Sequence, residues 1–220
     1  MKKTRIILLI ALLVGTLLAP AQATAWTSVR TGQKNFERAW LAYTFRRFDQ
    51  ASQHFAKAAD AFGAGLAEDP PSRTTMFASN LTMAGMSLYY AGRHAEVAAP
   101  MRKVMDKENR VWEAPLYAAL AAARLGDRAA TVDLLTRYLK TSPTQPILSA
   151  EVRRQLDALD SGAPALAQVA DTIEGAAFEQ FDNNINLVGS RGGEMRDYCD
   201  GNYWWRSNRQ PCLERFKYTN

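Results

Sequence analysis

The sequence is poor in the residues that build metal and redox sites. It contains two cysteines and two histidines in 220 residues. Cys199 and Cys212 lack the Cys-x-x-Cys spacing of redox-active thiols, and no Cys-x-x-Cys-His motif is present for haem attachment. His54 and His94 have no second histidine or acidic cluster beside them at ligand spacing. The sequence therefore predicts neither a metal site nor a bound cofactor.

Signs of a catalytic site are also few. The Asp and Glu residues are scattered along predicted helix surfaces, where a solvated charge is the usual state. The glycine-rich run at residues 189–193 lacks the Lys-Ser/Thr ending of a phosphate-binding loop, so we interpret it as a connector. We therefore expect a non-catalytic protein. An enzyme whose site consists of ordinary Asp, Glu or Arg residues remains the alternative.

No segment is long and apolar enough to cross a membrane. The strongly apolar run at residues 6–18 has 13 residues, whereas a membrane-spanning helix needs about 20. Basic residues precede this run and the small residues Ala21, Ala23 and Ala25 follow it, which is the layout of a secretory signal peptide. We expect residues 1–25 to be cleaved on export to the periplasm or medium, with no stable membrane insertion afterwards. An uncleaved anchor is the weaker alternative.

An excess of charge of one sign is lacking once this segment is set aside. Residues 1–25 hold three of the 27 Lys and Arg and none of the 22 Asp and Glu, which leaves a net charge of about +2. A near-neutral surface gives no electrostatic reason to propose nucleic acid or anionic lipid as the main ligand. Nucleic acid is therefore not expected as a partner.

The sequence does contain an internal repeat. Two similar segments, 81–109 and 115–143, align with their glycines Gly92 and Gly126 34 residues apart. In each segment small residues precede the glycine and larger residues follow it at spacing i, i+4: Ala84, Gly85, Val97, Met101 and Val104 in the first, and Ala118, Ala119, Ala122, Thr131, Leu135 and Tyr138 in the second. This pattern resembles the tetratricopeptide repeat (TPR) family, whose repeats are helical hairpins. Pro100 departs from it and predicts a kink or a delayed start in its helix.

A weaker copy precedes these two, at residues 35–62, with Arg46 where the turn glycine would stand. Residues 63–75, with their tandem prolines, are expected to separate it from the next copy. A closing helix is predicted near residues 147–159, and one or two short helices at 165–173 and 175–185. The expected fold is all-α: about three TPR-like hairpins with a capping helix (26–160), short helices (161–190) and an irregular tail (191–220).

The resemblance implies that first-helix side chains turned away from the second helix line a concave groove where a ligand binds. On this chain the groove would be aromatic and apolar with one cation, and its residues are Phe36, Trp40, Tyr43, Thr82, Met86, Tyr89, Tyr90, Leu116, Leu120 and Arg124. Such a surface suits an amphipathic helix or an apolar peptide. The leading hypothesis is a periplasmic scaffold that binds an envelope protein or peptide there. Alternatively, the chain's own C-terminal helices or tail fill the groove.

The tail supports a second hypothesis. Cys199 and Cys212 form an even pair in an exported chain, which predicts a disulfide. The intervening residues Tyr203, Trp204, Trp205 and Arg206 are a second candidate surface, which would recognise cell-wall glycan. The alternative is that these aromatic residues pack the loop onto the helices.

Overall fold

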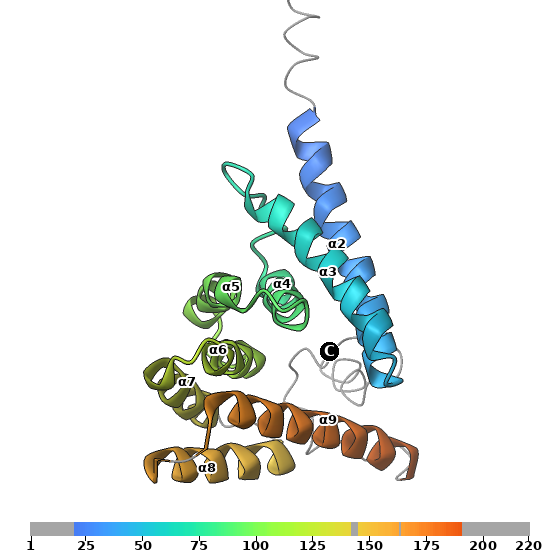
Figure 1. The fold of residues 1–220 in the computed structure, drawn as a ribbon. Helices are drawn as coiled ribbons and strands as arrows, with labels where there is room; N and C mark the ends of the chain where they lie inside the picture. The colour runs from blue at the N-terminus through green and yellow to red at the C-terminus, as the bar shows by residue number, and fades with distance from the viewer. Residues whose placement is uncertain (1–19, 142–144, 163, 191–220) are drawn as a thin grey trace, which may run out of the picture.

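A computed structural model describes residues 20–141, 145–162 and 164–190. The elements in these ranges are all helices (Figure 1): α2 (Pro20–Thr44), α3 (Phe48–Leu66), α4 (Ala78–Tyr90), α5 (His94–Lys107), α6 (Glu113–Arg124), α7 (Arg128–Lys140), α8 (Pro146–Asp160) and α9 (Leu166–Ser190). The predicted all-α class is confirmed. Outside the described residues lie most of the predicted signal peptide and the whole predicted disulfide tail, with Cys199, Tyr203, Trp204, Trp205, Arg206 and Cys212.

Consecutive helices pack in pairs, α2 with α3, α4 with α5 and α6 with α7. The same two backbone hydrogen bonds close each of these pairs. At the second turn, the N–H of Arg93 donates to the C=O of Leu88 at 2.9 Å and the N–H of Gly92 to that of Tyr89 at 3.0 Å. The equivalent bonds occur around Gly126 and Arg46. This is the Schellman arrangement, which satisfies carbonyl groups left over at the end of the first helix.

The turn geometry explains the glycine spacing. Gly92 and Gly126 have φ angles of +76° and +79°, in the left-handed region that a side chain disfavours. Arg46 has the equivalent position and a φ of +58°. The degenerate first copy therefore forms the same turn without its glycine.

Small residues let the helices approach closely. A Cβ atom added at Gly85 of α4 would lie 2.5 Å from the Cε of Met101 on α5. The alanine-rich α6 is buried from Glu113 to Ala123, because α4, α5, α7 and α9 all pack around it. α4 and α6 therefore form the centre of the molecule.

The structure differs from the sequence predictions in two helices. α5 continues through Pro100 and begins directly after its turn, so the predicted delay in its start is not found. Of the one or two short helices predicted at residues 165–185, the structure shows one, and α9 is longer than predicted, with 25 residues and Gly175 in its interior. Its buried residues Val169, Ile173, Ala177 and Phe181 follow one another at intervals of four across that glycine, which is helical spacing.

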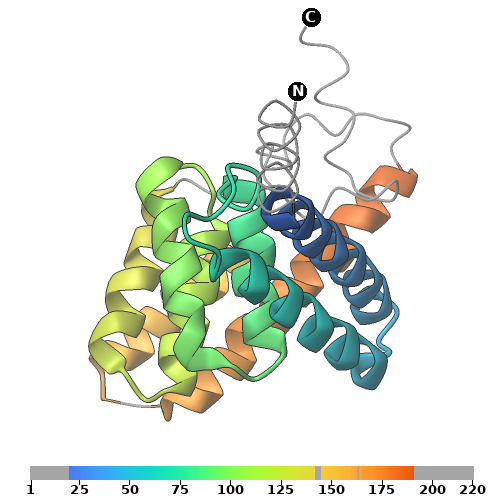
Figure 2. The same ribbon diagram turned by 90° about the horizontal axis from the view of Figure 1, so that it is seen from above.

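The last pair, α8 and α9, is joined through Gly162, whose φ is +89°. α9 also packs on α6, and its aromatic residues reach α2. In Figures 1 and 2, α9 accordingly runs from beside α8 past α6 toward the α2–α3 pair. Residues from opposite ends of the described chain meet along this helix.

The turn geometry yields a matched prediction. Gly126→Ala should lower the free energy of unfolding by about 1–2 kcal/mol, because alanine is strained at a positive φ. Gly63→Ala, in α3, should instead raise it by about 0.5–1 kcal/mol, since a Cβ at Gly63 meets no atom within 4 Å. Urea unfolding followed by circular dichroism measures both. Changes of the same sign would contradict the turn assignment.

Candidate functional site

The structure places the predicted groove residues beneath other parts of the chain. Phe36, Trp40, Tyr43, Thr82, Met86, Tyr89, Leu116 and Leu120 are buried, and Tyr90 and Arg124 are half-buried. α9 supplies contacts to residues of α2, α4 and α6 in this set. Trp40, Tyr43, Tyr89 and Arg124 thus contact one of the C-terminal helices, as in the second of the two alternatives drawn from the sequence.

We call six residues that contact α9 or support those contacts the α9-binding surface: Trp40, Tyr43, Arg46, Tyr89, Tyr90 and Arg124. Arg46 was not among the predicted site residues. Its signal in the sequence was its departure from the glycine of the repeat pattern.

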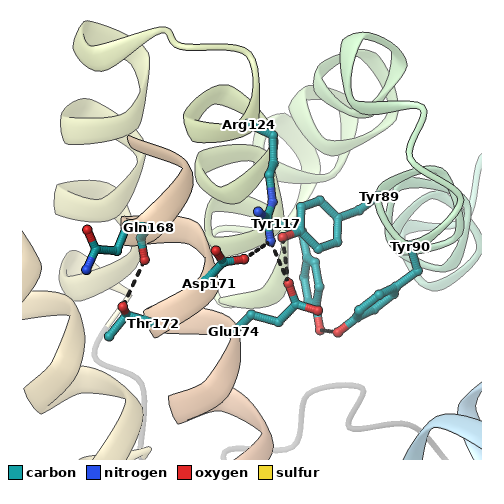
Figure 3. Close-up of polar contacts among 8 residues, drawn as sticks. All are labelled: Tyr89, Tyr90, Tyr117, Arg124, Gln168, Asp171, Thr172 and Glu174. Atoms are coloured by element: carbon teal, nitrogen blue, oxygen red, sulfur yellow. Dashed lines mark hydrogen bonds and ion pairs between the residues drawn. The ribbon is translucent and has the colours of Figure 1, made fainter. Parts of the chain in front are cut away.

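The polar end of this surface holds a carboxylate (Figure 3). The Tyr89 hydroxyl donates a hydrogen bond of 2.9 Å to Glu174 of α9, and Arg124 lies 3.3 Å from the same carboxylate oxygen. Arg124 also pairs with Asp171 at 2.6 Å. The Glu174 side chain is 25 % exposed, whereas that of Asp171 is 66 % exposed. Of these two carboxylates, Glu174 is therefore the half-buried one and Asp171 the exposed one.

Burial dominates the electrostatics of Glu174. Removal from water raises the pKa of its carboxyl group, and the Tyr89 hydrogen bond and the positive charge of Arg124 only partly oppose this. The charged form is thus less stable here than in water, even with two donors beside it. Glu174 gives α9 a specific position at a cost in stability.

Tyrosines surround this carboxylate. The hydroxyl groups of Tyr90 and Tyr117 share a hydrogen bond of 2.9 Å, and the ring of Tyr43 lies 4.8 Å from that of Tyr90. Burial raises the pKa of Tyr43, Tyr89, Tyr90 and Tyr117, and the nearby Glu174 charge raises each further. These phenols stay protonated at neutral pH, so they act there as hydrogen-bond donors and apolar rings rather than as bases.

Next to this polar end, the middle of the surface binds aromatic side chains of α9. The ring centroid of Phe178 lies 5.3 Å from that of Tyr43, and Phe181 meets Trp40 edge-on, also at 5.3 Å. Such aromatic pairs add about 0.5–1.5 kcal/mol beyond the area they bury. The contact is therefore apolar in its middle.

A second cation lies beyond the aromatic pairs. The Arg46 guanidinium is 5.1 Å from the centroid of the Phe178 ring and 3.4 Å from the Asp182 carboxylate. The surface thus presents arginines at both ends, with aromatic rings between them. The α9 residues that meet it share helical spacing in the sequence.

The two histidines lie in ordinary surroundings. The ring of His94 is 5.3 Å from that of Tyr89, and His54 Nδ1 is 3.4 Å from the Asn35 side-chain oxygen. Burial, together with the charge of Arg124, lowers the pKa of His94, which keeps it neutral at pH 7. Neither histidine supplies a charge to the α9 contact.

The raised pKa of Glu174 predicts a pH effect. The folded state binds its proton more tightly than the unfolded state does, so this group's contribution to stability rises as the pH falls through its raised pKa. The difference in unfolding free energy between wild type and Glu174→Gln should therefore shift in favour of wild type between pH 7 and pH 5. Urea unfolding at several pH values measures it. A difference independent of pH would show that the pKa of Glu174 is not raised in the folded protein.

Tyr89→Phe tests the hydrogen bond to this carboxylate. The substitution keeps the buried ring and should cost about 1–3 kcal/mol at neutral pH, because a buried acceptor loses its donor. In a Glu174→Ala background the same change should cost little, since the acceptor is already gone. Chemical denaturation of the four proteins gives the coupling energy. Equal costs in both backgrounds would contradict the pairing.

The part of the chain that the structure describes shows neither a metal site nor a membrane-spanning helix. Those residues include no group of three or more His, Cys, Asp or Glu placed to hold a metal ion. The described helices also include none long and apolar enough to span a membrane. Comparisons with protein-family models, with curated proteins and with solved structures find no match for this chain.

Proposed function

We propose that this chain is a non-catalytic scaffold of TPR-like helical hairpins that binds a helix of another protein, in competition with its own α9. One observation carries the proposal: the α9-binding surface receives a helix through aromatic rings flanked by arginines. Aromatic anchors of this kind dominate affinity in helix-in-groove recognition. The 34-residue glycine spacing and the paired helices support the repeat scaffold. The signal-like first 25 residues favour an envelope protein as the partner.

Competition requires that α9 be exchangeable, and its ion pairs are weak. Arg46 and Asp182 are 69 % and 41 % exposed, and Asp171 is largely in solvent. Exposed pairs of this kind contribute about 0–1 kcal/mol each. The ion pairs of Asp171 and Asp182 are thus contacts that water can readily replace, whereas Val169 and Ile173 of the same helix are fully buried.

The middle of α9 also contains elements that lower its stability. Glu174 is buried at a cost, as its raised pKa indicates. Gly175 follows it in the helix interior, where a Cβ would meet no atom within 4 Å, so close packing does not require a glycine. An interior glycine destabilises a helix by about 0.5–1 kcal/mol relative to alanine. These features suit a helix that can be displaced.

The titratable groups at this site favour binding over catalysis. Tyr89 and Arg124 both direct their polar atoms at Glu174, which leaves no nucleophile with a base beside it in this cluster. The glycan-binding alternative depends on Trp204 and Trp205, which lie outside the described residues.

Two glycine substitutions test the competition. An isolated helix is marginal in water, so released α9 loses much of its helicity. Gly175→Ala should therefore favour docked α9 by about 0.5–1 kcal/mol and reduce partner capture about two- to fivefold. Gly63→Ala, the same change in α3, should stabilise the protein similarly without altering capture.

The measurement is quantitative affinity capture from the envelope fraction of the source cells, with recovered proteins identified by mass spectrometry. Phe178→Ala removes an anchor of α9 while leaving the α9-binding surface intact, so it should increase recovery of the same protein. A genuine partner increases with Phe178→Ala, decreases with Gly175→Ala and is unchanged with Gly63→Ala. If no recovered protein follows this pattern, the proposal is wrong.

A further inference from the structure

The geometry points to the chemistry of the partner: an acidic, aromatic amphipathic helix that repeats the face α9 presents to the α9-binding surface. This inference rests on the proposed function, because it names the class of helix that would replace α9. It follows from the register in which α9 and its surface complement each other.

The α9 residues in the contact lie on one side of the helix. Asp171, Glu174, Phe178, Phe181 and Asp182 are separated by three, four, three and one residues. Spacings of three and four place side chains on one helix face. From the N-terminal to the C-terminal side, this face therefore presents two carboxylates, two phenyl rings and a third carboxylate.

The surface opposite has the complementary order. Arg124 lies against Asp171 and Glu174, at 2.6 and 3.3 Å. Arg46 lies against Asp182 at 3.4 Å. The rings of Tyr43 and Trp40 occupy the interval and meet the phenyl groups. Charge and shape thus match along about three turns of helix.

The arginines would also exclude other helices. A Lys or Arg at the position of Glu174 would oppose Arg124, which is only 24 % exposed and so is screened less by water than a surface charge. A neutral residue there would leave the Tyr89 hydroxyl without its acceptor and Arg124 with Asp171 as its one carboxylate partner. A helix with acidic groups at the ends of this face and aromatic groups between them gives the arginines carboxylate partners and the aromatic rings apolar ones.

The occupant we assign is a helix of a different protein. A second copy of this chain would offer the same α9 face, but its own α9 is already docked and connected to α8 by the short turn at Gly162. Exchange between copies would replace one contact by an identical one, with no gain in contacts. A separate protein adds a contact set that the chain alone does not have.

The test uses the full chain and a synthetic helix as the probe. A fluorescent peptide with the sequence of residues 166–183 carries the acidic face, and a matched peptide has Asn or Gln in place of Asp171, Glu174 and Asp182. The receptor is the chain with Asp171→Ala, Glu174→Ala and Phe178→Ala, which loosens α9 without changing the surface. Circular dichroism checks that this chain is folded, and fluorescence anisotropy gives Kd.

We expect the acidic peptide to bind the loosened chain at least tenfold more tightly than it binds wild type, and at least tenfold more tightly than the neutral peptide does. Arg124→Gln is then added to the loosened chain. In wild type this change would weaken α9 and peptide alike, whereas in the loosened chain it affects the peptide alone. It should lower affinity for the acidic peptide several-fold and leave the neutral peptide unchanged.

Several results would overturn the inference. The neutral peptide could bind as tightly as the acidic one, or Arg124→Gln could have no effect, and either would show that the surface selects only aromatic groups. The loosened chain could instead form a dimer by light scattering that excludes the peptide, which would make a second copy the occupant. If capture from the envelope follows the pattern given above while neither peptide binds, the proposed function stands and the acidic class is wrong. If both fail, both are wrong.

If the loosened chain does not fold, Gly175→Ala provides the test in the wild-type background. Placed in the chain, it should weaken acidic-peptide binding about two- to fivefold, because it favours docked α9. Placed in the peptide, it should strengthen binding by a similar factor, because it favours the peptide helix. Changes of the same sign would show that peptide and α9 do not compete, and would overturn the inference.

Discussion

The packing of α9 across the first helices of the pairs is the constraint on which the rest of the arrangement depends. α4 and α6 are buried along almost their whole length, so each needs neighbours on every side. Their own pair partners cover one side only. Without α9, aromatic residues such as Tyr43 and Tyr89 would face water, at a cost of about 25 cal/mol for each Å² of apolar surface exposed. The last described helix therefore completes a core that begins with the first.

Polar contacts set the position of α9 within that core. Apolar surfaces alone tolerate sliding, because the hydrophobic effect has no direction. Glu174 removes this freedom, since a shift of one turn would separate its carboxylate from Tyr89 and Arg124 together. Burial of this group lowers stability but sets the register of α9. Buried charged groups have the same role in other helical contacts.

The same features connect the fold to the proposed function. A helix that is held in one register by a carboxylate and two phenyl rings behaves as a ligand within its own chain. Its exposed ion pairs and its interior Gly175 keep the contact weaker than close packing would allow. A partner with the same face would meet a surface that is already shaped for it, so little further ordering would be needed on binding.

Most of the helices, the first three pairs and their turns follow from the amino-acid sequence alone. These depend on local rules: small residues where helices cross, a left-handed residue at each turn, and apolar residues at helical spacing. Even Arg46 could be placed at a turn, because its distance from the apolar residues that follow matched the glycine copies. Gly162, 36 residues after Gly126, carried the same signal for the fourth turn and was missed.

The element that covers the aromatic face, in contrast, is apparent only from the packing of distant helices. Arg46 and Asp182 are 136 residues apart in the chain, and no periodicity connects them. Four of the residues predicted from the repeat pattern contact one helix, α9, but local spacing does not distinguish an open binding surface from one that the chain fills itself. That outcome depends on whether a distant helix matches the face in shape and charge. α9 does so through side chains whose importance is apparent only once the two surfaces are in contact.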